Sequence, residues 1–278
     1  MINNFTFIDL FSGIGGFHSG LSKIGGKCVF ASDILPIARE TYYQNYKIQP
    51  FGDITKIKNS SIPNHDILCA GFPCQSFSNI GPRGGLNDPR GEMVYEIFRI
   101  LKGKKPKAFI LENVKGLISH QGGKTFKYII NQLGLLGYDV WSEILEAKDY
   151  GVPQIRKRLF IIGVRKNLKV NFTFPEPIKL KYSLSKVLNG KVERDFGFTV
   201  RIGGRHSGIN NRYNWDSYKV NGVSRYITPE ECLLLQGFKK TFKLKGTESQ
   251  KYYQVGNSVP VTIITEIGKE LLKHNFFK

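Results

Sequence analysis

Two short polar motifs carry side chains that could attack and protonate a substrate. The motif GFPCQSFS at residues 71–78 follows an apolar run and holds Cys74, whose thiol becomes a nucleophile when it loses its proton. The motif LENV at residues 111–114 follows another apolar run and holds Glu112, a carboxyl that can act as an acid if burial raises its pKa. Taken singly, an inert cysteine and a surface glutamate explain these residues equally well. Their shared position at the ends of apolar runs favours a reactive site.

A third motif, QIRKR at residues 154–158, supplies two cations. Arg156 and Arg158 are two positions apart, so in a strand their guanidinium groups lie on one face, where they can stabilise negative charge. No second cysteine or histidine has the spacing of a metal ligand, so we expect no metal. A cysteine protease needs a paired histidine, and none of the five histidines stands in a suitable context.

The loop FSGIGG at residues 11–16 has the character of a cofactor-binding turn. It is not a complete dinucleotide fingerprint, because His18 stands at the third glycine position. Asp33 ends the next apolar run and could accept hydrogen bonds from ribose hydroxyls, and Asp53 could accept one from an adenine amine. Each aspartate could equally cap a helix or a turn. Together they favour a nucleoside-containing cofactor, and the incomplete fingerprint leaves room for a ligand without phosphate, such as S-adenosylmethionine.

Strands must alternate with helices to bring these motifs together. The predicted strands cover residues 5–10, 28–31, 66–70 and 108–111, and the predicted helices cover residues 16–24, 92–101 and 126–136. This alternation predicts an α/β fold with a doubly wound, mostly parallel sheet. Residues 138–145 and 158–164 are separated only by a loop and are predicted to form an antiparallel hairpin at one edge. A last amphipathic helix is predicted over residues 257–274, with Asn257 or Ser258 as its N-cap.

Composition and charge restrict the class of protein and of partner. The 278 residues include 41 Lys and Arg against 22 Asp and Glu, a formal charge of +19, which favours a nucleic acid partner. With 41% hydrophobic residues the chain is globular, and no apolar run approaches the roughly 20 residues that span a membrane. The four cysteines form no CxxC pair and no signal sequence is evident, so we expect a cytoplasmic protein.

The basic residues are concentrated in the second half of the chain. Residues 178–222 hold nine Lys and Arg against three Asp and Glu and show no helical period. We therefore predict a catalytic, cofactor-binding domain over residues 1–168, a basic recognition domain with a hinge over residues 169–251, and a helix over residues 252–278 that returns to the first domain.

Six blocks in order make the chain resemble the DNA (cytosine-5)-methyltransferases of bacterial restriction–modification type. These blocks are DLFSGIGG at 9–16, GFPCQSFS at 71–78, ENV at 112–114, QIRKR at 154–158, RYITPEECLLLQGF at 225–238 and GNSV at 256–259. The resemblance implies a class I S-adenosylmethionine-dependent methyltransferase fold, with a Rossmann-like sheet and a small, irregular, β-rich target-recognition domain. It also implies that a cytosine is flipped out of duplex DNA before it reacts.

The resemblance assigns roles to individual residues. Cys74 adds to carbon 6 of cytosine, Glu112 donates to ring N3, and Asn113 holds the loop and the glutamate. Arg158 grips the carbonyl O2 with the help of Arg156. The implied cofactor-binding residues are Phe11, Gly13, Gly15, Asp33, Ile34, Asp53, Ile54, Pro73, Met93, Asn257 and Ser258. The implied DNA-contacting residues are Gln75, Ser78, Arg83, Arg201, Arg205 and Arg212, with His206, Asn210 and Asn211 as further donors in the insert.

One departure and two alternatives accompany this assignment. Asp33 stands where the family more often has Glu, and Ile34 stands where an aromatic residue is frequent, which weakens the expected stacking on adenine. A tRNA cytosine-5 methyltransferase shares the PCQ and ENV blocks, and a catalytically silent DNA-binding protein could keep the same fold. The resemblance also implies a prokaryotic protein that lies on the nucleoid, and a cognate restriction endonuclease that could act on the same site without a stable complex.

Overall fold

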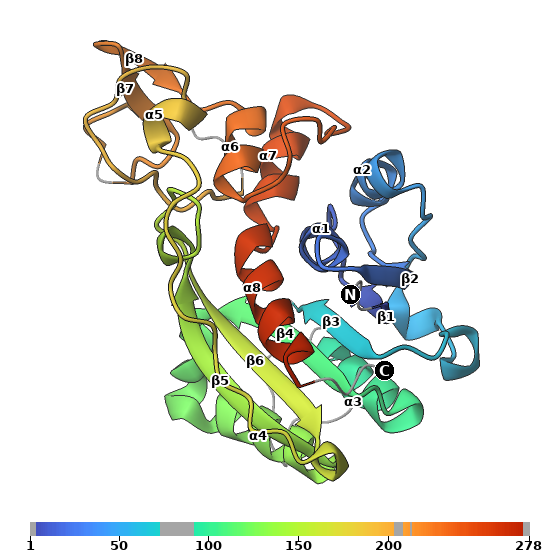
Figure 1. Ribbon diagram of the computed structural model, residues 1–278. Coiled ribbons are helices and arrows are strands. Elements are labelled where there is room, and N and C mark those ends of the chain that lie inside the picture. Colours follow the sequence, from blue (N-terminus) through green and yellow to red (C-terminus); the bar gives the residue numbers. More distant parts are fainter. Residues whose placement is uncertain (1–3, 73–91, 203–207, 212, 275–278) are drawn as a thin grey trace.

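Six strands pair side by side into one mostly parallel sheet (Figure 1). The computed structural model describes residues 4–72, 92–202, 208–211 and 213–274. The strand order is β2-β1-β3-β4-β6-β5, in which β1 to β4 are parallel and β6 is antiparallel to both neighbours. The strands are β1 Phe5–Leu10, β2 Gly26–Ser32, β3 Ile67–Gly71, β4 Ala108–Val114, β5 Tyr138–Glu146 and β6 Lys157–Arg165. The predicted parallel strands and the predicted edge hairpin are confirmed.

Helices cover both faces of this sheet because apolar side chains alternate along its strands. Phe5 and Phe7 of β1 belong to one core cluster, whereas Ile8 and Leu10 belong to the other. Helices α1 and α8 pack on the first face, and α3 and α4 pack on the second. These helices, with α2, are α1 Gly16–Ser22, α2 Pro36–Tyr46, α3 Glu92–Lys104, α4 Lys124–Leu135 and α8 Val261–Leu272.

A small unit, residues 183–256, forms a third core beside the sheet. It contains α5 Leu184–Val187, the two-stranded sheet of β7 Ser217–Val220 and β8 Val223–Tyr226, α6 Pro229–Leu235 and α7 Glu248–Gly256. Trp215 and Tyr218 are buried in its core, which also includes Ile14 from the loop after β1 and Val261 at the start of α8. The small unit is therefore packed directly against the loop that the sequence assigns to the cofactor.

Three sequence-based boundaries need correction. Asn257 is the C-cap of α7, and α8 begins after Pro260, so the N-cap predicted at Asn257 or Ser258 is wrong. Proline disfavours a helical conformation at the residue before it, which separates the two helices. The boundary at 251/252 falls inside α7. The boundary at 168/169 is also misplaced, because Phe172 packs in the core of the large sheet beside Trp141.

The helices of the described residues include none that combines the length and the hydropathy of a membrane span.

Candidate active site

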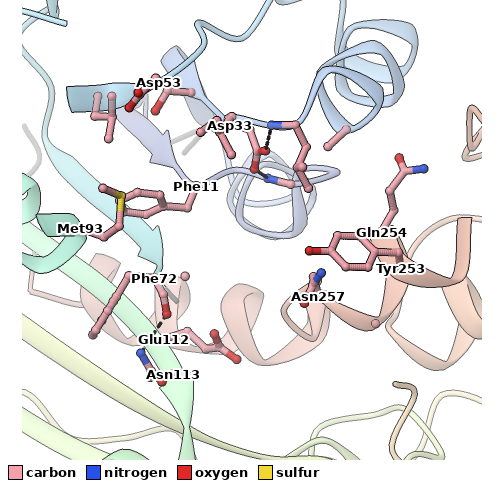
Figure 2. Close-up of a pocket in the computed structure, with 18 of the residues that line it drawn as sticks. Phe11, Asp33, Asp53, Phe72, Met93, Glu112, Asn113, Tyr253, Gln254 and Asn257 are labelled. Carbon is pink, nitrogen blue, oxygen red and sulfur yellow. Dashed lines mark hydrogen bonds between the residues drawn. The ribbon is translucent and has the colours of Figure 1, made fainter. Parts of the chain in front are cut away.

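The carboxyl ends of the parallel strands meet at a cavity of about 510 Å³ (Figure 2). Open α/β sheets bind their ligands at this end of the strands. The cavity receives described residues from eight separate parts of the sequence and includes most of the predicted site. The predicted residues that line it are Phe11, Gly13, Asp33, Ile34, Asp53, Ile54, Met93, Glu112, Asn113, Arg156, Arg158 and Asn257.

The turn after β1 brings bare backbone to one wall of the cavity. Phe11 has a φ of 52° and Gly13 a φ of 50°, a left-handed conformation that side chains with a Cβ rarely adopt. A Cβ placed on Gly13 would meet no atom within 4 Å, so it would enter the open cavity. Glycine at this position therefore lets a ligand approach the main chain.

Asp33 follows β2 and is fixed by two backbone amides. Its Oδ2 accepts from the Gly13 amide at 2.7 Å and its Oδ1 accepts from the Leu35 amide at 2.8 Å. Burial raises the pKa of Asp33, and these two hydrogen bonds oppose that rise. Asp53 caps a short helical turn, where its Oδ1 accepts from the Thr55 amide at 3.0 Å and from the Thr55 hydroxyl at 2.8 Å. Both carboxylates also line the cavity, so their capping role does not exclude binding a ligand.

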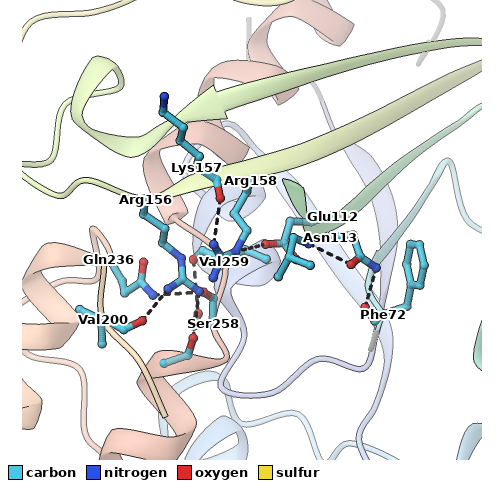
Figure 3. Close-up of polar contacts among 12 residues, drawn as sticks. Phe72, Glu112, Asn113, Arg156, Lys157, Arg158, Val200, Gln236, Ser258 and Val259 are labelled. Atoms are coloured by element: carbon cyan, nitrogen blue, oxygen red, sulfur yellow. Dashed lines mark hydrogen bonds and ion pairs between the residues drawn. The ribbon is translucent and has the colours of Figure 1, made fainter. Parts of the chain in front are cut away.

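The carboxyl of Glu112 lies at the opposite wall, near the end of β4. It is 9% exposed, and Arg158 Nε lies 3.0 Å from its Oε1 (Figure 3). Burial raises the pKa of Glu112, whereas the two nearby arginines, Arg158 and Arg156, lower it. The net direction is upward, so the protonated form of Glu112, which can donate to a substrate, persists to higher pH than that of an exposed glutamate.

Asn113 connects this acid to the segment that carries Cys74. Its Nδ2 donates to the carbonyl of Phe72 at 2.9 Å, and the backbone of Gly71 is paired with that of Glu112 in the sheet. The chain therefore leaves β3 at Gly71, beside Glu112 and two residues before position 73. This arrangement supports the predicted role of Asn113 in holding the loop.

Arg156 and Arg158 share a cavity but differ in their partners. Arg158 faces Glu112, whereas the Arg156 guanidinium is 1% exposed and donates to the carbonyls of Val200, Gly256 and Ser258. Four of the five N–H groups of an arginine belong to its two terminal nitrogens, and both of these nitrogens are engaged with backbone. These contacts hold the Arg156 guanidinium on backbone carbonyls and therefore do not favour the predicted role of Arg156 at the cytosine O2.

Two predicted cofactor residues do not reach the cavity. A Cβ on Gly15 would lie 2.4 Å from the Tyr46 ring, and Tyr46 donates to the Gly15 carbonyl at 2.7 Å, so this glycine serves packing. The Ser258 hydroxyl is buried and bonds the Val259 carbonyl at 3.3 Å. Both residues were predicted as ligand contacts because they are close in sequence to residues that do line the cavity, Gly13 and Asn257.

Several predicted residues lie outside the described part of the chain. They are Pro73, Cys74, Gln75, Ser78, Arg83, Arg205, His206 and Arg212. Arg201, Asn210 and Asn211 are described and exposed.

Helix α7 contributes cavity residues that the sequence did not predict. Tyr253 and Gln254 line the cavity beside Asn257, and the Tyr253 ring is 42% exposed (Figure 2). Gln254 accepts from the Thr41 hydroxyl at 2.6 Å, which ties α7 to α2. The apolar period of Tyr252 and Val255 was available in the sequence, but the surrounding lysines obscured the helix.

Comparison with known proteins places this architecture in a family. The family model for C-5 cytosine-specific DNA methylases matches residues 5–218 and 199–273. The chain belongs to that family. It is a DNA (cytosine-5)-methyltransferase, as the order of the six sequence blocks predicts.

Individual relatives cover nearly the whole of this methyltransferase. It is 39% identical to the type II methyltransferase M.MspI of a Moraxella species, over 97% of this chain and 71% of that protein. It is 34% identical to M.HhaI of Haemophilus parahaemolyticus, over 96% and 94% of the two chains. The fold matches Spodoptera frugiperda DNMT2, in a mutant form, with a TM-score of 0.78 at 23% identity over 98% and 100% of the chains. It also matches a putative prophage DNA methyltransferase of E. coli with a TM-score of 0.77 at 22% identity, over 97% and 99%.

Proposed function

We propose that this enzyme methylates one cytosine of a specific duplex DNA sequence, with S-adenosylmethionine as the donor and with a transient Cys74–carbon 6 bond. The observation that carries the proposal is one cavity with two kinds of wall. Phe11, Gly13 and Asp33 offer an aromatic ring, bare backbone and a carboxylate on one side. Glu112 and Arg158 offer an acid and a cation on the other.

The first wall fits the methyl donor. Gly13 leaves space where a Cβ would stand, and the acidic side chains of Asp33 and Asp53 suit ribose hydroxyls and an adenine amine. The exposed Ile34 offers an aliphatic rather than an aromatic surface to the adenine ring. When bound, S-adenosylmethionine supplies an electrophilic methyl group on a sulfonium.

The second wall fits a cytosine ring that must be activated. Attack by the Cys74 thiolate forms the S–C6 bond and moves the C5=C6 electron pair toward carbon 5. Glu112 gives its proton to ring N3, and Arg158 stabilises O2 through N–H groups that Glu112 and the Lys157 carbonyl leave unused. After carbon 5 is methylated, a base removes its proton, the C5=C6 bond re-forms, the thiolate leaves and Glu112 recovers its proton.

The cytosine cannot react inside a base stack, so it must be extruded at a cost of a few kcal/mol. We assign this task to the small unit, residues 183–256, and to the segment before it, which together overlap the recognition domain predicted over residues 169–251. Exposed Arg201, Asn210 and Asn211 are suited to phosphates or base edges. The enzyme would act where the DNA is, in the cytoplasm of a prokaryotic cell, and a cognate endonuclease could cut the same sequence.

Bisulfite sequencing of DNA from cells expressing the gene tests this proposal. We expect protected cytosines in one short sequence context. Transfer of tritiated methyl groups to duplex DNA and to tRNA, measured in parallel, separates the alternatives. Label in tRNA alone would exclude a duplex DNA substrate, and no label in either polymer would indicate a silent DNA-binding protein.

Gly13→Ala tests the donor wall. The added methyl group enters the cavity, and we expect the affinity for S-adenosylhomocysteine to fall at least tenfold by calorimetry. The same substitution also strains a positive-φ residue by about 1–2 kcal/mol. Gly137→Ala is the matched control, because Gly137 has a φ of 91°, has open space within 4 Å of where its Cβ would stand and lines no part of the cavity. Equal binding loss in both variants would assign the effect to strain.

A further inference from the structure

One buried guanidinium joins three segments that are far apart in the sequence. Arg156 Nη1 donates to the Val200 carbonyl at 2.8 Å, and its Nη2 donates to the carbonyls of Gly256 and Ser258, each at 2.9 Å (Figure 3). Gly256 and Ser258 flank the cavity residue Asn257, and Val200 precedes the exposed Arg201. The resemblance assigns Asn257 to the cofactor, so we count residues 256–258 as part of the donor wall and call them the donor-wall loop. The Arg156 side chain therefore contacts the backbone of the donor-wall loop and the backbone that leads to Arg201, a candidate DNA contact.

The segment ending at Val200 is held along its length. The backbones of Pro153 and Ile155 both bond Gly197, at 2.8 and 2.9 Å, and the Thr199 hydroxyl donates to the Ile155 carbonyl. The Val200 amide donates to Gln154 Oε1 at 3.1 Å. These hydrogen bonds therefore fix the backbone up to Val200, the residue before Arg201.

The donor-wall loop is held by a neighbouring pair of buried side chains, Gln236 and Gln154. Gln236, which is buried, donates to the carbonyls of Val255 at 3.0 Å and Ser258 at 3.1 Å. Gln154 in turn donates to Gln236 Oε1 at 3.2 Å. Buried polar groups of this kind specify one arrangement, because leaving any partner unpaired costs about 1–3 kcal/mol.

Close backbone contact provides a second, independent observation. A Cβ on Gly256 would lie 2.5 Å from the carbonyl carbon of Arg201 and 2.6 Å from the Ile202 nitrogen. Only glycine lets the two backbones approach this closely. The segment that leads to and includes Arg201, residues 197–202, is called the DNA-side segment. Its backbone therefore contacts the donor-wall loop directly, and Arg156 donates to a carbonyl of each.

We propose that Arg156 is a positioning residue rather than a catalytic one, and that it sets the placement of the DNA-side segment relative to the methyl-donor wall. The inference rests on the proposed function, which identifies those two surfaces. Losing this side chain must displace both surfaces together, although Arg156 itself touches only backbone carbonyls through its terminal nitrogens. A residue acting on the cytosine would instead affect the chemical step.

Arg156→Met removes the donors and keeps a similar length of side chain. We expect the dissociation constants for S-adenosylhomocysteine and for duplex DNA each to rise about tenfold, measured separately by calorimetry and by fluorescence anisotropy. The kcat at saturating substrates should stay within about threefold at its optimum. The alkaline decline of kcat should move to higher pH, because Arg156 no longer lowers the pKa of Glu112. These binding measurements need no turnover, so their failure is distinguishable from a failure to methylate cytosine.

Arg225→Met is the matched control. Arg225 also bonds a backbone carbonyl, that of Leu188, and an acid, Glu231, but all these contacts lie within the small unit. We expect this variant to keep its affinity for S-adenosylhomocysteine. An unchanged affinity for both ligands in Arg156→Met, or a lower kcat with unchanged affinities, would overturn the proposal.

Gly256→Ala provides a second route if Arg156→Met does not fold. Its added methyl group separates the two backbones while leaving Arg156 in place, and we expect the same paired loss of affinity. Gly134→Ala, in α4 with no neighbour within 4 Å, is the control for this variant. Retention of both affinities in Gly256→Ala would also contradict the proposed coupling.

Discussion

Cys74→Ala will abolish methyl transfer while leaving duplex binding intact. Carbon 5 of cytosine is a poor nucleophile until a thiolate has added to carbon 6, and alanine cannot make that bond. Removing a covalent nucleophile costs on the order of 10⁴-fold or more in kcat. DNA affinity should remain within about threefold, because a small side chain is lost and no charge contact to phosphate is removed.

Transfer of tritiated methyl groups and a gel-shift titration measure the two quantities on the same preparation. Cys69→Ala is the matched control, because Cys69 lies on β3 only five positions upstream and is fully buried. Burial raises the pKa of the Cys69 thiol well above its usual value, so it is no nucleophile. Measurable turnover by Cys74→Ala would rule out the covalent route.

Strands and their polar ends could be predicted because both signals are local. Apolar runs marked β1, β2, β3 and β4, and the residues directly after these runs had to gather at one edge of a parallel sheet. Asp33 and Glu112 were identified in this way, and both line the cavity. The chemistry of the site followed from the order of a few short motifs.

The errors arose where long-range packing decides what a residue does. Gly15 is required by the Tyr46 ring from α2, and no neighbouring residue in the sequence signals that contact. The Arg156 guanidinium is engaged by carbonyls 44, 100 and 102 positions away. Spacing suggested one strand face for the two arginines, but β6 begins at Lys157 and leaves Arg156 outside the strand. Spacing also could not indicate that distant backbone carbonyls would engage Arg156.

Glu112→Gln will lower kcat by roughly 10²–10⁴-fold, the range typical of a positioned acid. Glutamine keeps the shape and can still donate a weak hydrogen bond to N3, but it has no proton to transfer. It also removes the carboxylate that Arg158 contacts at 3.0 Å. Glu143→Gln is the matched control, because Glu143 lies on the same sheet, in β5, with an exposed side chain.

The proposed role of Glu112 also predicts in which direction kcat changes with pH. Burial raises the pKa of Glu112, so its protonated, donating form persists to higher pH than that of an exposed glutamate. Wild-type kcat should therefore fall as the pH rises through the raised pKa, and the Glu112→Gln variant should lack this alkaline decline. A wild-type rate that rises through the same range would mean that the carboxylate, not the acid, is the active form. A loss below threefold would remove Glu112 from the chemical step altogether.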